Sequence, residues 1–152
     1  MTDPNPSDLT AHLGYWLRYV SNHVSLAFAQ KVSANGVTVA EWALMRVLYD
    51  AGSAAPSALA ATMGMTRGAI TKLADRLAAK GLAVRAANPD DGRAQTLTLT
   101  EKGRALVPEL AALADANDAE FFAGLPPADR ATLERLLRDI VRRRGLTAIP
   151  VD

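Results

Sequence analysis

The sequence holds 152 residues with 49% hydrophobic side chains and a formal net charge of +1, which fits one domain, or one small domain with added helices, and excludes a disordered chain. It contains no cysteine, so disulfides, thiolate zinc sites and thiol-based redox sensing are excluded. No run of about 18 apolar residues occurs and no basic segment leads into an apolar stretch at the N-terminus, so we expect a cytoplasmic protein without a membrane span.

The first predicted helix begins near Ser7 or Asp8, either of which can cap it, and ends at Asn35-Gly36. Its length of roughly 27 residues exceeds the mean of about 11 to 12 for helices of globular proteins. Apolar residues recur along it at spacings of three and four and form one stripe: Leu9, Leu13, Trp16, Val20, Val24, Ala27 and Phe28. This stripe predicts packing in a core or against a helix of another chain.

Three shorter helices follow. Thr38 and Glu41 form the pattern of a capping box, which predicts a helix from this point to about Asp50. Pro56 suits the first turn of a third helix that ends at Gly64. Thr66 then caps a fourth helix, which ends at Gly81. Because only residues 64–66 separate the third and fourth helices, the pair predicts a helix-turn-helix.

A short hairpin is predicted next. Asp91-Gly92 lies between the β-compatible run 82–87 and the alternating run Thr96-Leu97-Thr98-Leu99, and Asp-Gly is a strong hairpin signal because both residues tolerate positive φ. Alternation points the two leucines inward. Thr100 caps a long helix over about 101–123, Leu125-Pro126-Pro127 breaks it, and a last helix covers about 127–144. The expected fold class is therefore mainly α, with a small β element.

The positive charge gathers around the hairpin, where residues 66–104 carry eight Lys and Arg against four Asp and Glu. The flanking parts, 1–65 and 105–152, are slightly acidic. On the fourth helix an apolar arc lies opposite a face of small residues and donors: Gly68, Thr71, Lys72, Asp75 and Arg76. Such a face suits the major groove of DNA, where Lys and Arg donate to guanine or phosphate and Thr touches the thymine methyl.

An isolated amphipathic helix with this face is more often simply solvated, but the hairpin beside it favours the DNA-binding interpretation. A helix-turn-helix followed directly by a basic hairpin is the winged arrangement, in which the helix takes the major groove and the wing lies along the backbone or in the minor groove. Arg93 at the hairpin tip suits a narrow minor groove, and Asp91 is close enough in sequence to orient it. Thr66 and Arg67 bring free backbone N–H groups to a phosphate.

Residues 66–103 resemble the corresponding part of the MarR family of transcriptional regulators. The similarity lies in the recognition helix, in the wing motif Asp91-Gly92-Arg93-Ala94 and in the exit Leu99-Thr100-Glu101-Lys102-Gly103, and it extends in order and spacing over nearly the whole chain. The family often has another basic residue in place of Gly92, so one phosphate contact fewer is expected here. The resemblance implies DNA contacts from Thr66, Arg67, Thr71, Lys72, Arg76 and Arg93, with Asp91 orienting Arg93.

The same resemblance implies a homodimer without a cofactor that binds pseudopalindromic double-stranded DNA, typically as a repressor. Residues 1–36 and 104–152 are then the helical dimerisation region, and residues 37–103 the winged helix-turn-helix. Family members are often released from DNA by small aromatic ligands. We expect such a ligand where the first, second and fifth helices meet the winged region, lined by some of His12, Tyr15, Trp16, His23, Trp42 and Arg46.

Other functions fit the sequence less well. No glycine-rich phosphate loop occurs, the two histidines lack metal-ligand spacing, and Asp90-Asp91 lie on an exposed turn, so we expect neither an enzyme nor a metal site. The run Arg142-Arg143-Arg144 is explained by the dipole at a helix C-terminus. A winged-helix module that binds protein, or a regulator without a ligand, stays open; binding by the former would not fall steeply with salt.

Overall fold

A computed structural model of the protein describes residues 5–88 and 91–147; the side chains of residue 88 and residues 91–94 lie outside the description. The elements in chain order are a 3₁₀ turn (Leu9–Ala11), α1 (Leu13–Ser33), α2 (Val39–Ala51), β1 (Ser53–Ala54), α3 (Pro56–Met63), α4 (Arg67–Ala79), β2 (Ala83–Asn88), β3 (Asp91–Leu99), α5 (Glu101–Phe122) and α6 (Pro127–Arg143). The predicted order of helices around one hairpin is confirmed.

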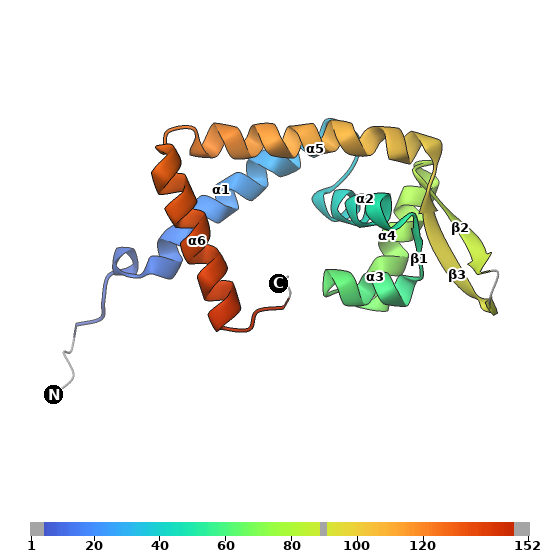
Figure 1. The fold of residues 1–152 in the computed structure, drawn as a ribbon, viewed down its shortest axis with the longest axis horizontal. Helices are drawn as coiled ribbons and strands as arrows, with labels where there is room; N and C mark the ends of the chain where they lie inside the picture. Colours follow the sequence, from blue (N-terminus) through green and yellow to red (C-terminus); the bar gives the residue numbers. More distant parts are fainter. Residues whose placement is uncertain (1–4, 89–90, 148–152) are drawn as a thin grey trace.

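Helix α5 connects the two ends of the molecule (Figure 1). At one end it runs beside α1 and leads into α6; at the other it meets α2 and the sheet. Because α2, α3, α4 and the sheet gather at this second end, the helix-turn-helix and the hairpin form one body. None of the helices in the described part of the chain has both the length and the apolar character that crossing a membrane requires.

The core lies in the winged region. The apolar arc predicted for α4 is buried, and its members Ile70, Leu73, Ala74 and Leu77 are at most 4% exposed. They form one cluster with apolar residues from every neighbouring element, including Leu44, Met45 and Leu48 of α2, Leu59 of α3, Leu97 and Leu99 of β3, and Val107 and Leu110 of α5. Burial of this one face leaves the opposite face of α4 to solvent.

The sheet has three antiparallel strands in the order β1-β3-β2. Leu97 and Leu99 point inward as predicted, at 1% and 4% exposure. Strand β1 was not predicted, because two residues are too few to show a period. It pairs Ser53 with Thr98 and Ala54 with Leu97, which fastens the entry to α3 to the base of the hairpin.

Three threonines cap helices as predicted. The hydroxyl oxygens of Thr38, Thr66 and Thr100 accept hydrogen bonds of 3.1 Å from the backbone N–H groups three residues on. Of the two hydrogen bonds in the predicted capping box, only the bond from the Glu41 backbone N–H to the Thr38 hydroxyl is present. The Glu41 carboxylate is 1% exposed and accepts two bonds from Lys80 Nζ, at 2.7 and 3.0 Å, so it links the start of α2 to the end of α4.

The first helix does not begin at Ser7 or Asp8 as a continuous rod. The chain makes a 3₁₀ turn at residues 9–11, becomes extended at His12 (φ −95°, ψ 127°), and enters α1 at Leu13. Trp16 Nε1 donates to the Thr10 carbonyl at 2.9 Å, which holds the turn against α1. Gly14 lowers the helix propensity at this point, which is consistent with a helix that begins only at Leu13.

Helices α1 and α6 expose most of their apolar side chains. No residue of α6 is buried, and in α1 only Val32 is. The exposed set includes Leu13, Trp16, Leu17 and Val20 of α1, together with Leu133, Leu136, Leu137, Ile140 and Val141 of α6. Exposed apolar faces of this kind often mark sites of protein–protein contact.

Candidate nucleic-acid interface

The outer face of α4 carries the predicted DNA-contacting residues. Thr66, Arg67, Thr71, Lys72 and Arg76 are all exposed along one helix of 13 residues and its cap. The Thr71 hydroxyl donates to the Arg67 carbonyl at 2.9 Å. While this bond lasts, Thr71 can offer a partner an acceptor and a methyl group but not a donor, which narrows its possible role in reading a base.

Three cations on this face have no ion pair with any carboxylate that the structure describes. Among the side chains that the structure describes, no ion pair involves Arg67, Lys72 or Arg76. Lys80 and Arg85, by contrast, pair with Glu41 and Asp75. The outer face of α4 therefore presents positive charge that can meet phosphate.

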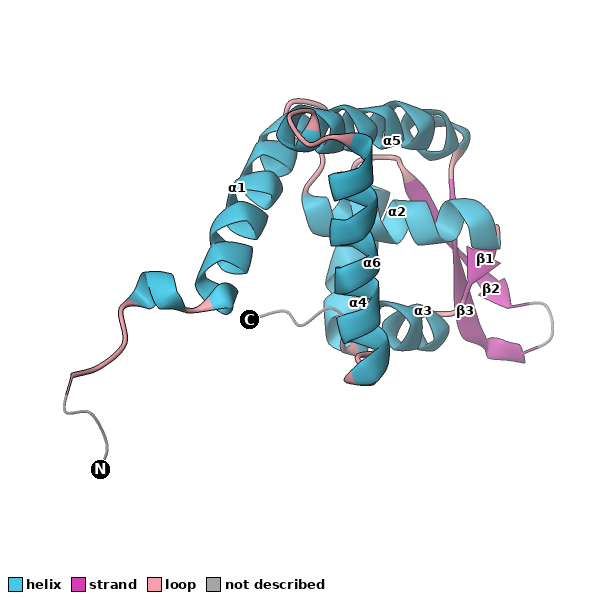
Figure 2. Cartoon of the chain, turned by 60° about the vertical axis from the view of Figure 1, so that its left-hand side comes forward, coloured by secondary structure: helices cyan, strands magenta, loops and turns pink. Residues whose placement is uncertain are grey.

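The hairpin of β2 and β3 extends away from the helices (Figure 2), and β2 contacts α4 at its base. Its register pairs Ala83 with Leu99, Arg85 with Leu97 and Ala87 with Gln95, and it shifts at Ala87/Asn88. The predicted contact residues Asp91 and Arg93 belong to β3 by their backbone, but their side chains lie outside the described residues. The ion pair between them stays a prediction.

Arg85 was not among the predicted site residues. Its Nη1 lies 2.6 Å from Asp75 Oδ1, and its Nη2 lies 3.3 Å from the Thr71 carbonyl oxygen. The hairpin is therefore joined to the outer side of α4. The sequence alone did not identify this contact, because the side that Arg85 faces follows from its pairing with Leu97 of β3.

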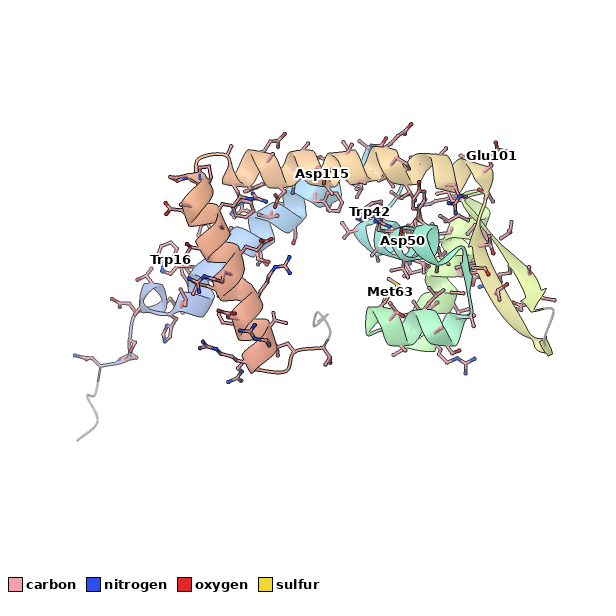
Figure 3. The ribbon with its side chains drawn as sticks, in the orientation of Figure 1. Trp16, Trp42, Asp50, Met63, Glu101 and Asp115 are labelled. Atoms are coloured by element: carbon pink, nitrogen blue, oxygen red, sulfur yellow. The ribbon has the colours of Figure 1, made fainter. Side chains whose placement is uncertain are left out.

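The structure of one chain does not bring the six predicted ligand contacts together. Trp16 is on α1 and Trp42 is on α2, in separate parts of the molecule (Figure 3). Tyr15 and His23 lie along one exposed side of α1, where His23 stacks on Tyr19. His12 is the extended residue that precedes α1. Their role in binding a ligand stays a prediction.

The remaining two candidates lie on α2 and have partners close by. Trp42 packs edge-on against Phe28 of α1, with ring centroids 6.4 Å apart. Arg46 pairs with Asp50 at 2.8 Å and lies over the ring of Tyr49. Both residues therefore have local structural partners.

An apolar groove of about 560 Å³ lies between α1, α5 and α6. Of the six predicted contacts only Trp16 lines it; the other walls come from residues such as Leu17, Val20, Phe122 and Leu137. Within the described ranges, no group of three or more His, Cys, Asp or Glu side chains is arranged to hold a metal ion.

Comparison with known proteins identifies related chains. A family model described as MarR family matches residues 35–94, the segment from the end of α1 to the hairpin. A protein assigned as a transcriptional regulator of the hcr operon in Thauera aromatica is 30% identical over 140 residues, which cover 91% of this chain and 84% of that protein.

Solved structures show the same architecture. A cysteine-to-serine mutant of MarR from Escherichia coli, complexed with operator DNA, aligns with a TM-score of 0.78 and 27% identity over 89% of this chain and 99% of that one. BpsR from Bordetella bronchiseptica, whose DNA binding is regulated by 6-hydroxynicotinic acid, aligns with a TM-score of 0.77 and 27% identity over 90% of this chain and 97% of that one.

Proposed function

Because the chain belongs to the MarR family of transcriptional regulators, we propose that it binds operator DNA as a homodimer, with α4 in the major groove and the β2–β3 hairpin as the wing. The observation that carries this proposal is the outer face of α4, where Arg67, Lys72 and Arg76 are exposed, and none of the described carboxylates pairs with them. A related structure of the same fold is a complex with operator DNA, which supports the assignment.

Each residue type on this face suits a particular contact. Lys72 and Arg76 donate to guanine edges or to phosphate, and Thr71 meets a thymine methyl. Gly68 has no side chain and permits close approach, while the N-terminus of α4 at Thr66 and Arg67 attracts a phosphate through free N–H groups. Arg93 enters the minor groove or binds the backbone from the wing.

The exposed apolar faces of α1 and α6 support a dimer formed by the terminal helices. A dimer presents two copies of α4, and both fit the major groove when they are about one helical turn, roughly 34 to 36 Å, apart. The operator is then pseudopalindromic, and binding over a promoter represses transcription.

A small aromatic ligand relieves DNA binding in this proposal. The DNA binding of BpsR is regulated by an aromatic acid, 6-hydroxynicotinic acid, which supports this part of the proposal. A ligand that favours another spacing of the two α4 helices lowers DNA affinity, and by linkage it binds the DNA-free dimer better by the same factor. Thermal-shift screening of aromatic acids tests this part; the absence of any stabilising compound would count against it.

Fluorescence-anisotropy titration tests the DNA-binding proposal. The protein is titrated against its own upstream intergenic DNA and a scrambled duplex at two salt concentrations. Arg93→Ala is expected to weaken binding to the native duplex by about tenfold or more, which corresponds to the roughly 1 to 3 kcal/mol of a good groove contact. Lys72→Ala is expected to flatten the salt dependence by about one unit if Lys72 binds phosphate, or to relax base preference if it reads a base.

Arg143→Ala, on α6, is the matched control and should leave affinity unchanged. Unchanged affinity of Arg93→Ala would refute the wing assignment. Binding that is equal for both duplexes and insensitive to salt would contradict DNA recognition and favour a protein-interaction module.

A further inference from the structure

The contact between the hairpin and α4 has the geometry of a tether. Building on the proposed function, we propose that Arg85 and Asp75 couple the wing to the recognition helix α4. The contact of α4 with the major groove and the contact of Arg93 on the wing with DNA are then made together. Arg85 is thus a positioning residue for the wing. It reads no base itself.

The strand register explains why Arg85 reaches α4. Arg85 of β2 lies opposite Leu97 of β3, and side chains of directly opposed residues share one face of a sheet. Leu97 is 1% exposed, so this is the face that covers the core. Ala83, two residues earlier on the same face, is buried as well. Arg85 therefore stands where the apolar contact between sheet and α4 ends, and its guanidinium continues that contact with polar bonds.

The guanidinium holds α4 at two points. Asp75 and Thr71 are four residues apart, so they lie one above the other on the same side of the helix. One terminal nitrogen of Arg85 binds the Asp75 carboxylate at 2.6 Å and the other donates to the Thr71 carbonyl at 3.3 Å. A planar fork with two separate contacts restricts rotation of the strand relative to the helix, whereas a lysine ammonium at the same position would act as a single point.

Little else among the described residues fixes the direction of the outer hairpin. Beyond Arg85, Ala86, Ala87 and Gln95 are all exposed. The Arg85 side chain is 33% exposed and that of Asp75 is 60% exposed, and ion pairs of this kind add little to folding stability. Loss of the pair is therefore expected to change the orientation of the wing more than the stability of the fold.

The pair also changes the electrostatics of the DNA-facing surface. Asp75 is the acidic residue on the outer face of α4, and a free carboxylate there would repel phosphate. Arg85 neutralises it from the wing side. Residues Lys72 and Arg76, which lie near Asp75 in sequence, stay available to DNA.

A double-mutant cycle tests the coupling. DNA affinity is measured for the full-length parent protein, Arg85→Met, Arg93→Ala and the double variant. If the tether positions the wing, Arg85→Met weakens binding, and the effect of Arg93→Ala falls from about tenfold in the parent to less than about threefold in the Arg85→Met background. Thermal denaturation of Arg85→Met checks that the fold is intact, and Arg85→Lys is expected to lie between parent and Arg85→Met.

Asp75→Asn separates the tether from a direct phosphate contact by Arg85. With a tether, Asp75→Asn also reduces the effect of Arg93→Ala. With a direct phosphate contact, Asp75→Asn frees Arg85 and removes a negative charge, so affinity rises and the effect of Arg93→Ala is unchanged; that result would overturn the tether. An effect of Arg93→Ala that is equal in all backgrounds would do the same. An Arg93→Ala variant that binds like the parent would overturn the wing assignment and the tether together.

Discussion

Gly103, in the first turn of α5, lies where the base of the wing leaves no room for a side chain. A Cβ atom at this position would overlap the Leu82 carbonyl oxygen and would lie 3.3 Å from a methyl carbon of Leu99. The Leu82 carbonyl cannot easily move, because it accepts a hydrogen bond of 3.0 Å from the Thr100 backbone N–H. Only glycine therefore fits at this point of α5.

Replacement of Gly103 by alanine is expected to destabilise the protein by about 2 kcal/mol or more, since overpacking against a fixed backbone costs more than the gain in helix propensity of about 1 kcal/mol. Chemical denaturation measures the change. Gly68→Ala in α4 is the matched control: its nearest neighbour, Thr66 Oγ1, is 4.0 Å away, so this variant should be as stable as the parent or more stable. A Gly103→Ala variant with parental stability would contradict the close packing.

At the scale of elements, a buried polar joint connects α1 to α5. Asn117 of α5 is 3% exposed; its Nδ2 donates to the Val24 carbonyl at 3.1 Å, and its Oδ1 accepts a bond of 2.9 Å from Lys31 Nζ. Lys31 also pairs with Glu120 at 3.0 Å. The joint sets how α1 lies along α5, and so where the exposed face of α1 is presented.

Asn117→Leu is expected to lower the free energy of unfolding by about 1 to 3 kcal/mol, because it leaves the part-buried Lys31 ammonium and Val24 carbonyl without these hydrogen bonds. Glu120→Gln alters the other partner of Lys31. Because the Glu120 side chain is 63% exposed, this change should cost less than about 1 kcal/mol. Urea denaturation distinguishes the two. If both variants lowered the free energy of unfolding equally, burial of Asn117 would not contribute to stability beyond the exposed pair of Lys31 with Glu120.

Elements defined by local signals could be predicted from the sequence. The caps at Thr38, Thr66 and Thr100, the hairpin and the buried arc of α4 depend on residues close in sequence, and the structure has all of them. The exposed face of α4 follows from the same periodicity. The predicted place of Asp91-Gly92 in the tip of the hairpin is wrong, because both residues belong to strand β3, where Asp91 pairs with Asn88.

Features that depend on contacts between distant residues could not be predicted. Strand β1 exists because β3 lies beside it. The Glu41 carboxylate binds Lys80 in place of its own helix cap. The extended conformation of His12 goes with a more local bond, from Trp16 to Thr10, which no sequence pattern signals. The link from Arg85 to Asp75 required the strand register. None of these contacts leaves a repeating pattern in the sequence.

At the scale of the whole molecule, the terminal helices expose an apolar surface, which a second copy covers in the proposed homodimer. Ile140 of α6 is 46% exposed within this surface. Ile140→Glu places a charge there, so we expect a shift from dimer to monomer and a loss of DNA affinity of at least about tenfold, since one subunit holds only one half-site.

Light scattering after size-exclusion chromatography measures the oligomeric state. Arg143→Glu, in the last turn of the same helix, is the control and should stay dimeric. A dimeric Ile140→Glu variant with parental affinity would place the subunit interface elsewhere.

Selection of binding sites from a random duplex library tests the central claim most directly, because the operator sequence does not have to be known. If two α4 helices and two wings read DNA as a symmetric pair, the enriched sequences will form an inverted repeat with half-site centres about 10 to 10.5 base pairs apart. Failure to enrich any motif, or enrichment of single sites without symmetry, would contradict recognition by a homodimer.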